Sequence, residues 1–193
     1  MKVTLLGDSI RQIGYGTVVP EMLGEEFEVY QPKENGRFAA NTLRGLFDWR
    51  EDMKGSNIIH WNNGIWDVLD HFGDGPFSST EQYVETMLRI ARILKSRCDV
   101  LIFATTTALG EEVVDIVEEG IVIRESVIRD FNAALVPKLE EMGVVINDLY
   151  ALTAGHREYI RPDKFHLSEL GIKKVGEEVT KVIKTAAKTI KEK

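Results

Sequence analysis

The chain has 193 residues, with 24 Lys and Arg against 31 Asp and Glu, which gives a formal net charge of −7. This length suits one domain with a sizeable core, and we expect a single domain over residues 1–193. The acidic balance argues against nucleic-acid or anionic-membrane partners, and no apolar run approaches the ~20 residues of a membrane span.

Five short runs rich in Val, Ile, Leu and Phe have the length of strands that are buried on both faces. They lie at residues 2–6, 27–31, 57–61, 99–105 and 143–147. Stretches with helical period follow at 38–49, 81–95, 123–142 and 169–188. This alternation predicts an α/β fold, a three-layer α/β/α sandwich with a five-stranded parallel sheet.

In such sheets, ligands bind beyond the carboxyl ends of the strands, where the strand order reverses. The loops that follow the five predicted strands are therefore the place to look for functional residues. They are residues 7–16, 32–37, 62–75, 106–120 and 148–166.

The first of these loops places Gly7-Asp8-Ser9-Ile10 directly after a strand. A glycine permits a sharp exit from the strand, and a serine on the next turn is then held at the sheet edge as a candidate nucleophile. The alternative is that Ser9 caps a helix, because Ser9-x-x-Gln12 fits a capping box. From this loop alone, both interpretations stay open.

Near the other end, Asp163-Lys164-Phe165-His166 precedes the last predicted helix. An aspartate three residues before a histidine can accept from Nδ1–H, which leaves Nε2 free to act as a base. Alternatively, Asp163 caps the final helix and His166 has no catalytic role. By itself, the pair favours the capping interpretation.

The middle loops carry neutral hydrogen-bond donors. Gly36 follows the second predicted strand, and Asn62 and Asn63 follow the third. Together with the N–H of Ser9, such donors would form an oxyanion hole. Each could equally be turn chemistry, and only their co-location at one sheet edge favours the functional interpretation.

With these residues in sequence order, the chain resembles the SGNH hydrolases, the GDSL-type esterases and lipases, over nearly its whole length. The resemblance implies a flavodoxin-like sandwich. It also implies Ser9 as nucleophile, Gly36 as oxyanion donor, His166 as base and Asp163 as the residue that orients it. The third block departs from the family's G-x-N-D pattern, because Gly64-Ile65-Trp66-Asp67 has Trp in place of Asn. The amide donor must then be Asn62 or Asn63, and we favour Asn62.

The expected reaction is hydrolysis of a small carboxylic ester through an acyl-enzyme, with no cofactor. Trp61 and Trp66, with Phe72 and Phe77, could form an aromatic wall for a sugar ring, which suggests an O-acetyl group on a carbohydrate. Arg37 and Arg161 could hold an anionic group. Structural use of the aromatic residues is an equal alternative.

The remaining candidates predict no further chemistry. His60, His71 and His156 lack partners at metal-ligand spacing, so no metal site is predicted. Cys98, the single cysteine, excludes an internal disulfide and is expected to be inert. Because the N-terminal apolar run is too short for a signal peptide, we expect a cytoplasmic protein.

Two matters stay open at this level. The acidic segment 111–119 is either a solvated face or a mobile lid. The functional alternative is a non-catalytic flavodoxin-like module, or a degenerate hydrolase, that binds a carbohydrate or another small ligand. The oligomeric state is not predicted.

Overall fold

The computed structural model describes residues 1–192 and has a five-stranded sheet at its centre. The strand order is β2-β1-β3-β4-β7, and every neighbouring pair is parallel. The strands are β1 (Lys2–Leu6), β2 (Glu28–Tyr30), β3 (Ile58–Asn62), β4 (Val100–Ala104) and β7 (Val145–Asn147). The predicted five-stranded parallel sheet is therefore confirmed, and each predicted strand overlaps an observed one.

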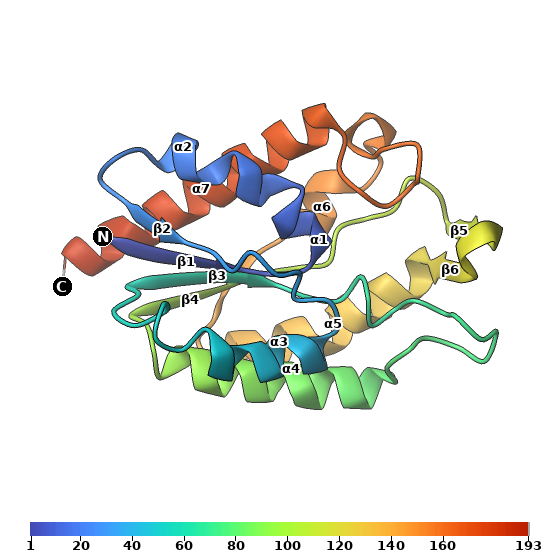
Figure 1. The fold of residues 1–193 in the computed structure, drawn as a ribbon, viewed down its shortest axis with the longest axis horizontal. Helices are drawn as coiled ribbons and strands as arrows, with labels where there is room; N and C mark the ends of the chain where they lie inside the picture. The colour runs from blue at the N-terminus through green and yellow to red at the C-terminus, as the bar shows by residue number, and fades with distance from the viewer. Residues whose placement is uncertain (193) are drawn as a thin grey trace.

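Helices cover both faces of the sheet, which confirms the three-layer sandwich (Figure 1). In that view α1, α2 and α7 lie above the sheet, and α3, α4 and α5 lie below it. The helices are α1 (Ser9–Gln12), α2 (Val19–Leu23), α3 (Ala39–Asp48), α4 (Thr80–Lys95), α5 (Glu125–Glu141), α6 (Leu149–Thr153) and α7 (Glu169–Lys191). Short 3-10 turns lie at η1 (Tyr15–Thr17), η2 (Val117–Glu119) and η3 (Arg157–Tyr159).

The core follows the apolar periodicity of the sequence. All five residues of β3 are buried, as expected for a central strand with helices on both faces. On α4 the buried stripe contains Tyr83, Met87, Ile90 and Leu94. Tyr83 stacks on Phe131 of α5 with ring centroids 4.6 Å apart, which joins the two helices under the sheet.

One prediction was wrong. Residues 113–124 form an antiparallel hairpin, β5 (Val113–Ile116) and β6 (Ile121–Arg124), so α5 begins at Glu125 rather than at 123. Gly120 turns the hairpin with a φ of 62°. The acidic segment 111–119 is thus largely a strand and its turn. The hairpin is tied to the loop after β3, because Asp70 and Val122 exchange backbone hydrogen bonds of 2.8 and 2.9 Å.

The strand order reverses next to β1, since the chain passes from β1 outward to β2 and then returns across β1 to β3. The carboxyl ends of β1 and β3 therefore form the edge at which this architecture binds ligands. Within residues 1–192, the longest helices carry too many polar residues for any of them to cross a membrane.

Candidate active site

The loop after β1 presents Ser9 at the switch point. Asp8, not Ser9, caps α1, since its carboxylate accepts from the N–H of Ile10 at 2.9 Å. The capping-box alternative for Ser9 is therefore wrong. A Cβ on Gly7 would lie 2.0 Å from Oδ1 of Asn62, so only glycine lets β1 turn this close to β3.

The turn before α7 presents His166 to Ser9, although the two residues are 157 positions apart. Nε2 of His166 lies 3.0 Å from Oγ of Ser9, and Nδ1 lies 3.0 Å from Oδ2 of Asp163. With the proton on Nδ1, Nε2 accepts a hydrogen bond from the serine hydroxyl. Ser168 caps α7, so the capping alternative for Asp163 is also wrong.

Asp163 is held in its ionised form. Burial opposes its charge, but its carboxylate accepts from the backbone N–H of His166, from Nδ1 of His166 and from the N–H of Phe165. These hydrogen bonds outweigh burial and keep the pKa of Asp163 below its ordinary value. The carboxylate thereby fixes the imidazole ring and its tautomer.

The three predicted oxyanion donors point elsewhere, which corrects that prediction. The N–H of Gly36 donates to the carbonyl of Gly7 at 2.9 Å. Nδ2 of Asn62 donates to Asp8 at 2.8 Å, and Nδ2 of Asn63 donates to the carbonyl of Arg37 at 2.9 Å. Gly36, Asn62 and Asn63 are also buried, and none of them lines the cavity that Ser9 and His166 border. These residues therefore hold the three loops together rather than facing that cavity.

A chain of hydrogen bonds continues behind Asn62. Its Oδ1 accepts from the Tyr15 hydroxyl at 2.7 Å, which lies 3.4 Å from Nδ1 of His60. Nε2 of His60 lies 3.1 Å from Nδ2 of Asn147. Complete burial lowers the pKa of His60 to about 3, so this histidine stays neutral. It is structural, as predicted.

A cavity of about 320 Å³ opens beside Ser9 and His166. Its other walls are mostly apolar and come from α1, the loop after β3, the hairpin and the turn before α7. They include Ile13, Ile65, Leu69, Ile121 and Phe165. His71 also lines this cavity, whereas His156 is exposed and pairs with Glu158.

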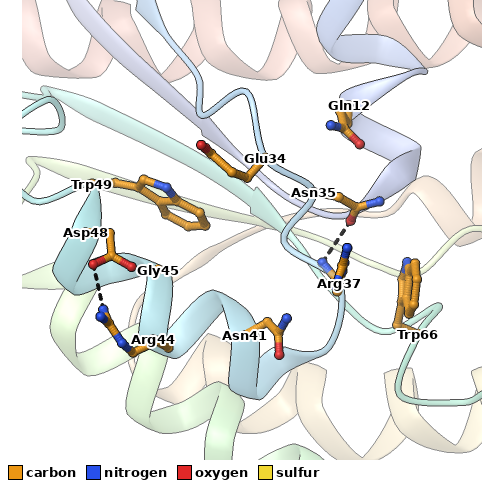
Figure 2. Close-up of a pocket in the computed structure, with 10 residues that line it drawn as sticks. All are labelled: Gln12, Glu34, Asn35, Arg37, Asn41, Arg44, Gly45, Asp48, Trp49 and Trp66. Carbon is orange, nitrogen blue, oxygen red and sulfur yellow. Dashed lines mark hydrogen bonds and ion pairs between the residues drawn. The ribbon is translucent and has the colours of Figure 1, made fainter.

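A larger cleft of about 920 Å³ lies next to this cavity and shares Gln12, Asn35 and Trp66 with it. Figure 2 shows the ring of Trp49 at one end of the cleft and that of Trp66 at the other. A Cβ on Gly45 would lie 2.3 Å from the Trp49 ring, so this glycine lets the indole lie against α3. Polar side chains of Glu34, Asn41, Arg44 and Asp48 complete the lining.

The predicted substrate-binding residues divide into two groups. Trp66 lines both hollows, and the guanidinium of Arg37 lies 5.8 Å from its ring centroid. Trp61 is fully buried against Phe103, with centroids 4.8 Å apart, so its assignment to the site was wrong. Its position in the predicted central strand could have indicated this burial, since such strands are buried on both faces.

Further polar groups do not extend the site. Burial raises the pKa of the Cys98 thiol to about 12, and the thiol donates to the carbonyl of Leu94. Among the described side chains, no three His, Cys, Asp or Glu residues gather where they could hold a metal ion. Of the residues that line the cavity, only Ser9, Trp66 and His166 were assigned to the site from the sequence; Asn35 and Ile121 are among those that sequence reasoning missed.

Known proteins resemble this chain in sequence and in fold. No protein-family model matches the chain. The curated GDSL esterase/lipase WDL1 of Oryza sativa subsp. japonica is 27% identical over 200 residues, which cover 94% of this chain and 77% of that protein.

Solved structures share the fold. The acetyl xylan esterase AlAXEase superposes with a TM-score of 0.77 at 17% identity, over 95% of this chain and 100% of its own. A lipase/acylhydrolase from Enterococcus faecalis superposes with a TM-score of 0.74 at 17% identity, over 95% of both chains.

Proposed function

We propose that this chain, which belongs to the SGNH hydrolase family of carboxylic ester hydrolases, cleaves its ester with a Ser9-His166-Asp163 triad. The observation that carries this proposal is the continuous contact from Ser9 Oγ to His166 Nε2 and from His166 Nδ1 to Asp163, at 3.0 Å each. These contacts meet at the mouth of an apolar cavity.

The proposed reaction follows from this geometry. Ser9 Oγ attacks the ester carbonyl while Nε2 of His166 takes the hydroxyl proton, and Asp163 stabilises the imidazolium that forms. The tetrahedral intermediate collapses, and the departing alkoxide takes the proton from His166. Water, deprotonated by His166, then attacks the acyl-enzyme and releases the carboxylic acid and free Ser9.

Substitution Ser9→Ala tests the proposal. The hydroxyl hydrogen-bonds to His166, and losing it should lower kcat for p-nitrophenyl butyrate by about 10⁴-fold or more, with the melting temperature nearly unchanged. Ser96→Ala, at an exposed serine on the last turn of α4, is the matched control and should keep wild-type activity. Hydrolysis that survives Ser9→Ala would contradict the serine mechanism.

We further propose how the two hollows divide the substrate. The apolar cavity beside Ser9 receives the acyl group, and the polar cleft with Trp49 and Trp66 receives the alcohol. Flat indole faces combined with amide, carboxylate and guanidinium groups suit a polyhydroxylated ring, so the alcohol is a carbohydrate. The cavity holds an acetyl group with space for several more carbons, since its volume is about 320 Å³.

Two measurements test this division. Replacing p-nitrophenyl acetate by the butyrate should raise kcat/KM by up to about 15-fold, since each of the two added methylenes contributes about 0.8 kcal/mol when it is buried. Trp49→Ala should raise KM for an O-acylated sugar far more than for a p-nitrophenyl ester. Phe47→Ala is the control, because Phe47 is 60% exposed and lines a different groove. Equal effects of Trp49→Ala on both substrates would refute the assignment of the cleft.

A further inference from the structure

A tetrahedral intermediate on Ser9 needs hydrogen-bond donors for its oxyanion. One donor is the backbone N–H of Ser9, because the first residue of α1 has no intrahelical acceptor for it. Gly36, Asn62 and Asn63 donate to other groups, are buried and do not line the cavity beside Ser9. A second donor must therefore come from another part of the cavity wall.

Asn35 is the asparagine that lines the cavity together with Ser9 and His166. Its Oδ1 accepts from the N–H of Arg37 at 2.8 Å, in a local turn that gives Arg37 a φ of 49°. This hydrogen bond fixes which end of the amide is oxygen. Figure 2 shows the oxygen turned toward Arg37 and the nitrogen turned the opposite way. Among the groups that the structure describes, none accepts a hydrogen bond from Nδ2 of Asn35.

The loop that carries Asn35 is held in place from behind. The guanidinium of Arg11, which is buried, donates to the carbonyl of Pro32 at 2.8 Å and to that of Glu34 at 2.7 Å. The N–H of Gly36 fastens the other side of Asn35 to Gly7. The residues before and after Asn35 are thus anchored to α1 and β1, the elements that position Ser9. A donor held in this way needs no reorganisation during the reaction.

Gln12 is the other carboxamide in the cavity wall. Its Nε2 donates to the carbonyl of Lys33 at 2.7 Å, so it is turned toward the loop after β2. Asn41 lines the larger cleft but not the cavity that contains Ser9. Asn35 is the carboxamide that combines a place beside Ser9 with an uncommitted nitrogen among the described residues.

We propose that Nδ2 of Asn35 donates a hydrogen bond to the oxyanion, together with the N–H of Ser9. As Oγ of Ser9 bonds to the carbonyl carbon, the π electrons move to the carbonyl oxygen and the serine proton moves to His166. The neutral amide then stabilises the negative oxygen until the carbonyl re-forms and the alkoxide leaves. This inference rests on the proposed serine mechanism, and it places the amide donor after β2 rather than after β3.

Three substitutions distinguish the proposed donor role of Asn35 Nδ2 from the role of its Oδ1 in the local turn. Asn35→Asp is nearly isosteric and keeps the acceptor for Arg37 N–H, and Asn35→Ser keeps an acceptor without adding charge. Asn35→Ala removes both the acceptor and the donor. If Nδ2 is the donor, all three lower kcat for p-nitrophenyl butyrate by about 10²- to 10³-fold, with KM changed less than about threefold. Asn57→Asp, at the amino end of β3, is the control and should keep wild-type kcat.

The outcomes distinguish the two claims. If Asn35→Ala loses activity while Asn35→Asp and Asn35→Ser keep it, Asn35 only shapes the turn and the inference is overturned. If all three variants keep wild-type kcat, it is overturned as well. In both cases an inactive Ser9→Ala variant leaves the serine mechanism standing. An active Ser9→Ala variant overturns the serine mechanism itself, and the inference with it.

Discussion

Two polar clusters lie near the turn at Gly7, and they differ in whether their groups border a cavity. The triad consists of Ser9, His166 and Asp163, and it borders a cavity. The buried polar network runs from Asp8 through Asn62, Tyr15 and His60 to Asn147, and each of these side chains hydrogen-bonds to the next. Both clusters contain a histidine and an aspartate.

The difference between the clusters is one of partners and exposure rather than residue type. His60 is fully buried, and both of its ring nitrogens lie next to groups of the network. His166 keeps Nε2 for a serine hydroxyl that faces a cavity. A buried cluster whose groups hydrogen-bond to one another holds the loops in place. A cluster that borders a cavity can exchange protons with a substrate.

Among the variants that compare these two clusters, Asp163→Asn should have the largest effect. An amide cannot stabilise the imidazolium and can orient the ring in the wrong tautomer, so kcat should fall by about 10⁴-fold. The melting temperature should change little, because the Asp163 side chain is 35% exposed. A loss of less than tenfold would show that His166 does not depend on this carboxylate.

The network should respond in stability instead. Asn62→Leu leaves the Tyr15 hydroxyl without its acceptor and Asp8 without a donor, both in a buried setting. The free energy of unfolding should fall by about 2–4 kcal/mol, as measured by urea denaturation. Asn57→Leu, at a partly buried position, should cost less, since water can reach its former partners, the N–H of Lys2 and the carboxylate of Asp99. Unchanged stability with lost activity would contradict this structural role and favour Asn62 as an oxyanion donor.

Most of the fold and the residues of the triad could be predicted from the sequence. The five strands and the long helices follow from apolar runs and amphipathic periods, which burial on one or both faces imposes. Ser9, Asp163 and His166 were singled out by their places on loops at one sheet edge, and the resemblance to the SGNH hydrolases implied their roles. The hairpin was missed because its short strands pair with each other and with Asp70, outside the main sheet.

The oxyanion donors could not be assigned from the sequence for another reason. Asn35, Asn62 and Asn63 are the same residue type on neighbouring loops. Whether an amide lines the cavity or is buried beside an acceptor, such as the Asp8 carboxylate or the carbonyl of Arg37, depends on the distance between its loop and the neighbouring loops. That distance is set by tertiary packing, as is the burial of Trp61.

A smaller effect concerns the pH dependence of stability at Asp8. Burial raises the pKa of Asp8 to about 6, despite the hydrogen bonds from Asn62 and the N–H of Ile10, which lower it. The folded state binds this proton more tightly than the unfolded chain, whose Asp pKa is about 4. Asp8 therefore adds no cost below about pH 4, and its ionisation lowers stability as the pH rises through about 6.

Asp8→Asn isolates this contribution. Asp67 has its pKa raised to about 6, chiefly by burial, and it is present in both proteins, so the difference reports Asp8 together with its weak repulsion by Asp67. Relative to wild type, the variant should gain about 2–3 kcal/mol in unfolding free energy between pH 4 and 7.5. A difference that stays constant over this range would contradict a raised pKa for Asp8.

The smallest expected effect tests the hairpin as a wall of the acyl cavity. Ile121→Ala removes apolar surface from that wall and should lower the butyrate-to-acetate ratio of kcat/KM by about two- to fourfold. Val117→Ala is the control on the same hairpin, because Val117 is 80% exposed and does not line this cavity. An unchanged ratio in Ile121→Ala would place the acyl chain elsewhere.

The most direct test of the central claim is covalent labelling with a fluorophosphonate, followed by mass spectrometry of the labelled peptide. The account predicts one phosphonyl group on Ser9, strongly reduced labelling in Asp163→Asn and none in Ser9→Ala. Labelling of a different residue, or no labelling of an enzyme that hydrolyses p-nitrophenyl butyrate, would contradict it.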